Sequence, residues 1–130
     1  MVLFHGLGGD RRQWLDVLPA NFPFRTLLPD LPGHGQANWL PPSGCSFTSF
    51  VDLAHHWLST NSGSEPVMLG GISTGAGIAV RLARLLPERV QKLVLVRPAW
   101  QTSHSQTIYV CCSDWGWPSV KQYGANTVIL

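Results

Sequence analysis

The chain has 130 residues, of which 45% are hydrophobic and 12% charged, and its formal net charge is +2. This length suits a single domain, and so low a charge content argues against both a disordered chain and a coiled coil. The basic residues form no run, so the composition gives no sign of binding to nucleic acid or to an anionic membrane surface.

We expect neither a targeting segment nor a membrane span. Residues 1–4 are apolar but lack the basic flank and cleavage site of a secretory signal. The uncharged stretch at 31–51 is interrupted by prolines, serines and a histidine, which is incompatible with a membrane helix. The three cysteines include the adjacent pair Cys111 and Cys112 and show no zinc-binding spacing, so free thiols and a cytoplasmic location are predicted.

The first half of the chain alternates between short apolar runs and turn-rich or amphipathic segments. Residues 2–4 predict a strand that ends in a glycine-rich turn at 6–9. A helix is expected at 10–18, where the next residue is a proline that stops it. A second strand is predicted at 24–28, ended by the turn at 30–35.

The next segments continue the alternation. A long helix capped by Ser46 or Thr48 precedes a third strand at 66–69. A second amphipathic helix is expected at 74–86 and a fourth strand at 90–96. The resulting βαβαβαβ order predicts an α/β fold with a mostly parallel sheet between helical layers, in which an active site forms at the carboxyl ends of the strands.

The last thirty residues do not continue the pattern of alternating strands and helices. No helical period appears after Trp100, although 107–112 and 127–130 could form strands, the first of them along the edge of strand 90–96. We therefore divide the chain into a core at 1–100 and an atypical, irregular C-terminal tail at 101–130.

The pattern G-x-S-x-G occurs once, as Gly71, Ser73 and Gly75 between a predicted strand and a predicted helix. This is the context of a nucleophile elbow, in which the serine hydroxyl is exposed on a sharp turn and the glycines provide clearance. The N–H of Thr74 then lies at the helix N-terminus, where it has no helical partner and can stabilise an oxyanion.

The turn after the first strand offers a second oxyanion donor. It reads His5-Gly6-Leu7-Gly8-Gly9, and the backbone N–H of Leu7 is the candidate. The sequence gives little support for a dinucleotide-binding loop here, because Arg11 stands where that motif needs a glycine. His5 and the later His34 are interpreted as turn or packing residues, and His55 and His56 as solvated helix residues.

Three segments together resemble the α/β-hydrolase family, in the order that the family has them: 5–9, 30–35 and 71–75. The resemblance covers about residues 1–100 and corresponds to the N-terminal half of the family core, its strands three to six. It implies Ser73 as the nucleophile, with Leu7 and Thr74 as backbone oxyanion donors and with support from the motif residues His5, Gly6, Gly71 and Gly75. It also implies a small ester or acyl substrate and no cofactor or metal.

The sequence departs from this family after the nucleophile. The family's triad runs serine, acid, histidine, but here only Glu88, Asp114 and His104 follow Ser73. Glu88 is expected at the opposite rim of the sheet, and His104 precedes Asp114. We therefore expect impaired catalysis, and we hypothesise that the chain is truncated or frame-altered after about residue 100.

Three functions remain open on the sequence. The first is a serine hydrolase acting on a small ester or acyl compound. The second is a non-catalytic fragment or pseudoenzyme that acts only through association, because exposed edges of a partial sheet favour self-association and marginal stability. The third is an acyltransferase that uses the same serine.

Overall fold

The computed structural model describes residues 1–41, 44–98, 108–112 and 120–123. Along the chain these form β1 (Val2–Phe4), α1 (Arg12–Leu15), α2 (Phe47–Asn61), β2 (Val67–Ile72), α3 (Thr74–Leu85), β3 (Val90–Val96), β4 (Ile108–Cys112) and β5 (Val120–Tyr123).

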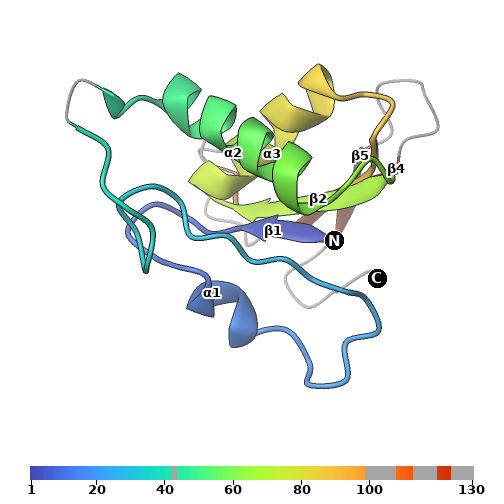
Figure 1. The fold of residues 1–130 in the computed structure, drawn as a ribbon. Coiled ribbons are helices and arrows are strands. Elements are labelled where there is room, and N and C mark those ends of the chain that lie inside the picture. The colour runs from blue at the N-terminus through green and yellow to red at the C-terminus, as the bar shows by residue number, and fades with distance from the viewer. Residues whose placement is uncertain (42–43, 99–107, 113–119, 124–130) are drawn as a thin grey trace.

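The strands form one sheet in the order β1-β2-β3-β4-β5. The pairs β1–β2 and β2–β3 are parallel, whereas β3–β4 and β4–β5 are antiparallel. Figure 1 shows α2 and α3 together on one face of the sheet and α1 on the opposite side of β1. The α/β architecture with helices on both sides of a parallel core is therefore confirmed.

Two predicted elements are shorter than the sequence suggests. The expected strand at 24–28 contributes a single bridge, in which Leu27 accepts a hydrogen bond from the Leu3 N–H at 3.0 Å. Pro23 and Pro29 flank this segment, and proline cannot donate to a strand ladder. The first helix is confined to Arg12–Leu15, where Trp14 is the one buried residue, so it has no apolar stripe to extend it.

The core is built by the two long helices against the parallel strands. Ser46 caps α2, accepting the Ser49 N–H at 3.0 Å, as one of the two predicted caps. Many of the buried core residues lie at periodic positions of the helices or in the strands. They include Val51, Ala54 and Leu58 of α2, Ala76, Ile78, Ala79 and Leu82 of α3, and Phe4, Leu69 and Leu93 of the strands.

The C-terminal segment adds strands to this core. As predicted, residues 108–112 pair along the edge of β3, in antiparallel register from Lys92 with Cys112 to Val96 with Ile108. Strand β5, which the sequence did not predict, pairs with β4. The tail that was expected to be irregular therefore contributes two strands to the sheet. The possible strand at 127–130 lies outside the described residues. Neither α2 nor α3, the longest helices of the described part of the chain, is long and apolar enough to cross a bilayer.

Candidate active site

Ser73 lies at the corner between β2 and α3. Strand β2 ends at Ile72, the helix begins at Thr74, and the serine between them has φ 51° and ψ −112°. A positive φ is rare for a residue with a side chain and costs free energy that the surrounding structure must offset. The Ser73 N–H donates to the Val96 carbonyl at 2.9 Å, which ties the corner to the end of β3.

Two buried glycines let the chain turn at this corner. A methyl group on Gly71 would overlap the backbone of Gly75 and Ala76, and one on Gly75 would overlap the carbonyl oxygens of Phe4 and His5. The helix start is thus packed directly against the end of β1 and against the strand that precedes it. Glycine is required at both positions by backbone approach, as the motif predicts.

The glycine-rich turn after β1 lies beside Ser73. A Cβ atom built on Gly6 would be 3.4 Å from the Ser73 Cβ. The side chain of Leu7 is 65% exposed on this rim. Within the described residues, neither the N–H of Leu7 nor that of Thr74 takes part in a hydrogen bond. The structure therefore brings the two candidate oxyanion donors to the rim that carries Ser73, and their role remains a prediction.

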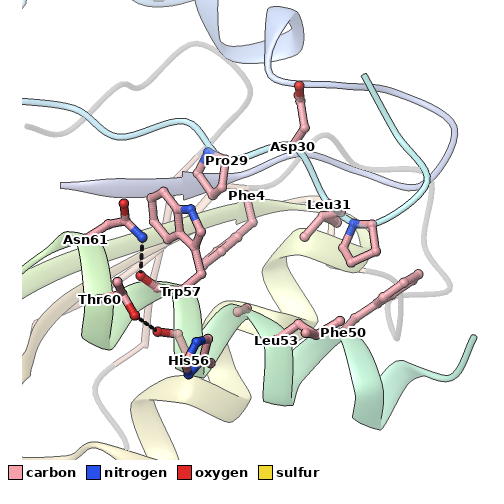
Figure 2. Close-up of a pocket in the computed structure, with 12 residues that line it drawn as sticks. Phe4, Pro29, Asp30, Leu31, Phe50, Leu53, His56, Trp57, Thr60 and Asn61 are labelled. Atoms are coloured by element: carbon pink, nitrogen blue, oxygen red, sulfur yellow. Dashed lines mark hydrogen bonds between the residues drawn. The ribbon is translucent and has the colours of Figure 1, made fainter. Parts of the chain in front are cut away.

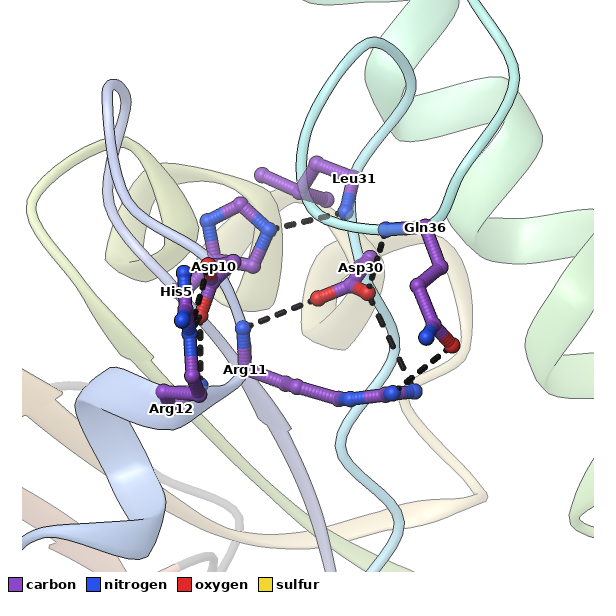
Figure 3. A network of polar contacts seen from close by, with 7 residues as sticks. All are labelled: His5, Asp10, Arg11, Arg12, Asp30, Leu31 and Gln36. Atoms are coloured by element: carbon purple, nitrogen blue, oxygen red, sulfur yellow. Dashed lines mark hydrogen bonds and ion pairs between the residues drawn. The ribbon is translucent and has the colours of Figure 1, made fainter.

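A polar network connects this turn to the segment at 30–36 (Figure 3). Asp30 accepts the backbone N–H of Arg11 at 2.9 Å and that of Gln36 at 3.0 Å. Burial alone would raise the pKa of Asp30, but these two N–H groups and the Arg11 guanidinium outweigh it and hold the pKa below its ordinary value. Asp30 therefore acts as an ionised bridge between two loops.

Gln13 supports the same turn from α1. Its Oε1 accepts the Gly6 N–H at 2.9 Å, which holds the backbone immediately before Leu7. Neither the contact of Gln13 nor the bridging role of Asp30 was predicted from the sequence. The only available signal for Asp30 was its position directly before a Leu-Pro-Gly turn, where a carboxylate commonly accepts backbone N–H groups.

His5 is fully buried and joins the two loops. Its Nε2 accepts the Leu31 N–H at 2.8 Å, so the proton lies on Nδ1, which donates to the Gly6 carbonyl at 2.8 Å. Burial lowers the pKa of His5 below its ordinary 6.5, and His34 acts in the same direction, while the Gly6 carbonyl, Asp30 and Asp10 act against it. The interpretation of His5 as a packing residue agrees with this neutral, fully bonded ring.

Stability should fall at mildly acid pH because of His5. A lowered pKa in the folded state means that the unfolded chain binds the proton first, so the contribution is complete above pH 6.5 and is lost as the pH falls below that value. We expect the urea midpoint to decrease from pH 7 to pH 5 in the native chain. In His5→Gln, whose amide oxygen can accept the Leu31 N–H without titrating, this part of the decrease should vanish; an unchanged pH profile would contradict the assignment.

No base contacts the serine within residues 1–41 and 44–98. The Ser73 hydroxyl makes no hydrogen bond there, and both ring nitrogens of His5 and of His34 are engaged by backbone groups. Glu88 is exposed in the turn before β3, at the end of the sheet opposite the serine, as predicted. His104 and Asp114 lie outside the described residues. In the described part of the chain no group of three or more His, Cys, Asp or Glu side chains could hold a metal ion.

A pocket of about 330 Å³ lies between α2 and the segment at 29–32 (Figure 2). Its apolar lining includes Phe4, Phe50, Leu53 and Trp57. This pocket was not predicted from the sequence, because these residues have the pattern of an ordinary helix–sheet core. Asp30 and Leu31 of the polar network line this pocket, whereas Ser73 does not.

A positive-φ serine between a parallel strand and a helix, beside a glycine-rich turn, has the geometry of a nucleophile elbow. The model of the family described as the alpha/beta hydrolase fold matches residues 1–110. The chain belongs to the α/β-hydrolase family.

Curated relatives and solved structures agree with this assignment. The chain is 36% identical over 100 residues to the dihydrolipoyllysine-residue acetyltransferase component of the acetoin cleaving system of Cupriavidus necator, covering 75% of this chain and 26% of that protein. It is 30% identical over 122 residues to the pimeloyl-[acyl-carrier protein] methyl ester esterase of Pectobacterium carotovorum, covering 93% of this chain and 42% of that protein. It therefore spans less than half the length of either relative.

Two solved structures share the fold of most of this chain. A thioesterase domain from the curacin biosynthetic pathway superimposes with a TM-score of 0.68 at 26% identity, covering 73% of this chain and 36% of that chain. A thermophilic esterase from Thermogutta terrifontis gives a TM-score of 0.64 at 27% identity, covering 72% and 35%.

Proposed function

We propose that this chain carries the nucleophile and oxyanion part of a serine hydrolase that acts on small ester or acyl substrates, with Ser73 as the nucleophile. The observation that carries the proposal is the positive φ of Ser73 at the corner between β2 and α3. Strain of this kind persists where the surrounding structure enforces it, and it is concentrated at functional sites. The esterase among the relatives and the esterase and thioesterase domain among the solved structures support the substrate class.

The chemistry follows from the geometry of the rim. The Ser73 oxygen attacks the substrate carbonyl carbon, and the carbonyl oxygen becomes an oxyanion that the N–H groups of Leu7 and Thr74 stabilise. The tetrahedral intermediate expels the alcohol or thiol, leaving an acyl group on Ser73 that water then releases. The described residues bring no base to Ser73, so we propose that solvent water takes up the hydroxyl proton and returns a proton to the leaving alcohol or thiol. Turnover by this chain is therefore slow.

Reaction with a fluorophosphonate probe tests the proposed function, because the probe forms a covalent bond with an activated serine. We expect slow labelling of the full chain that disappears in Ser73→Ala. The hydrolysis of a p-nitrophenyl ester should be lost in the same variant. In the native chain we expect a rate enhancement over the uncatalysed reaction in water of no more than about 10³–10⁴-fold, which is the enhancement that remains in hydrolases without a complete triad. Ser59→Ala, an exposed serine of α2, is the matched control and should label like the native chain.

Absence of labelling in the native chain would contradict the hydrolase proposal and favour the non-catalytic alternative. Acyl transfer is the second candidate function, because one relative is named as an acetyltransferase component. Addition of an amine or alcohol acceptor during ester turnover separates these two activities. Formation of an acylated acceptor, dependent on Ser73, supports transfer, whereas free acid alone supports hydrolysis.

The remaining expectations about partners and location belong to the same proposal. We propose a small-molecule ester or acyl partner, no binding to nucleic acid or membrane, and a cytoplasmic location. Self-association through sheet edges remains a proposal as well. It no longer concerns the edge of β3, because β4 pairs with that strand.

A further inference from the structure

Two imidazoles connect the turn that carries Leu7 to the loop at 30–36, and each accepts a hydrogen bond from the loop that contains the other. His5, which follows β1, accepts the Leu31 N–H of the second loop at 2.8 Å. His34, which belongs to that second loop, accepts the Gly8 N–H of the first loop at 3.3 Å. The rings lie side by side, with centroids 5.2 Å apart and an angle of 52° between their planes.

The two rings share one protonation state. Each Nε2 accepts a backbone N–H, so each proton is on Nδ1, where His5 donates to the Gly6 carbonyl at 2.8 Å and His34 donates to the Pro32 carbonyl at 2.9 Å. A second proton on either ring would point an N–H at another N–H. The arrangement therefore works only with both imidazoles neutral.

These contacts surround a single residue. Gly6 is held at its carbonyl by His5, and Gly8 is held at its N–H by His34. Leu7 lies between them, and its own N–H makes no hydrogen bond within the described residues. Both neighbours are fixed while the donor between them is left available.

We propose that His34, together with His5, is a positioning residue that fixes the Leu7 N–H for oxyanion stabilisation. This inference rests on the proposed hydrolase function, since it assigns a role in that same site. His34 does not touch the reacting atoms and acts through the Gly8 N–H. The charged groups around the pair are Asp10 and Asp30, which are held by Arg12 and Arg11, and the neighbour from α2 is the uncharged Phe50.

Two variants of His34 in the full chain test the proposal. His34→Gln keeps an acceptor near the Nε2 position, whereas His34→Leu keeps the bulk without an acceptor. We expect His34→Leu to slow fluorophosphonate labelling of Ser73 about tenfold. This is less than the roughly 10²–10³-fold loss in rate that follows complete removal of an oxyanion donor, because the Leu7 N–H is still present. His34→Gln should label within about threefold of the native chain. Equal labelling of all three would overturn the proposal.

Nuclear magnetic resonance gives a readout that does not depend on activity. In the native chain at pH 8 the His34 ring should show a proton on Nδ1 and none on Nε2. The Gly8 amide should exchange with solvent about fivefold faster in His34→Leu than in the native chain or in His34→Gln. The same measurements on Ser73→Ala should give the native pattern.

The two proposals can fail separately. If the native chain does not label but the Gly8 amide responds as expected, the hydrolase function is contradicted while the contact between the loops stands. If the chain labels but the Gly8 amide and the labelling rate are indifferent to the acceptor at position 34, the positioning role is contradicted and the hydrolase function stands.

Discussion

Gly71→Ala is expected to lower the free energy of unfolding by about 3 kcal/mol, at the upper end of the usual cost of overpacking a core. The added methyl group would overlap the backbone of Gly75 and Ala76, which cannot move without displacing the start of α3. Since α3 begins immediately after Ser73, the same change should also abolish labelling of the serine. Urea denaturation and fluorophosphonate labelling measure the two effects.

Gly70→Ala is the matched control, one residue earlier in the same strand. Its methyl group would meet the end of the Leu3 side chain and, at 3.1 Å, the Val94 carbonyl oxygen. A side-chain end can rotate away, so we expect a cost of about 1 kcal/mol and retained labelling. Equal effects at positions 70 and 71 would show that the corner is not as tightly packed as described.

Ser73→Gly is expected to be more stable than Ser73→Ala by about 1–2 kcal/mol, while both variants lose all labelling. Alanine must keep the positive φ of this position, whereas glycine adopts it without strain. At most positions alanine is the more stabilising of the two residues, because glycine loses more conformational entropy on folding. The expected order at position 73 is the opposite.

Ser59 provides the comparison for this pair. It is an exposed residue of α2, where Ser59→Ala should exceed Ser59→Gly in stability by about 1 kcal/mol. Thermal or urea denaturation of the four variants gives the two differences. If alanine is the more stable substitution at both positions, the corner at Ser73 is not strained.

The sequence predicts the helices and strands that bury an apolar face of their own. It does not predict correctly the strands whose pairing is decided by other segments of the chain. Strand β3 is found over the predicted range 90–96, and α3 begins at the predicted Thr74, because apolar periodicity and the elbow motif mark both. The segment at 24–28 has strand-like composition but contributes only one bridge, at Leu27, because flanking prolines remove donors. The strand β5 has too weak a pattern of its own to be predicted.

Some residues of the candidate site can be identified from the sequence, whereas the contacts of others cannot. The motif identifies Ser73, Gly71 and Gly75, since tight backbone geometry leaves a local signature. The contacts of His34 with Gly8 and of His5 with Leu31 join positions 26 residues apart. No local pattern encodes such a pairing, so these histidines could be predicted only as turn or packing residues.

The residue that the probe labels decides whether Ser73 is the nucleophile. The full native chain is treated with a fluorophosphonate probe, digested with a protease, and the peptides are sequenced by mass spectrometry. We expect the adduct on Ser73 and on no other serine. An adduct on a different serine, or a chain that remains unmodified at Ser73, would contradict it.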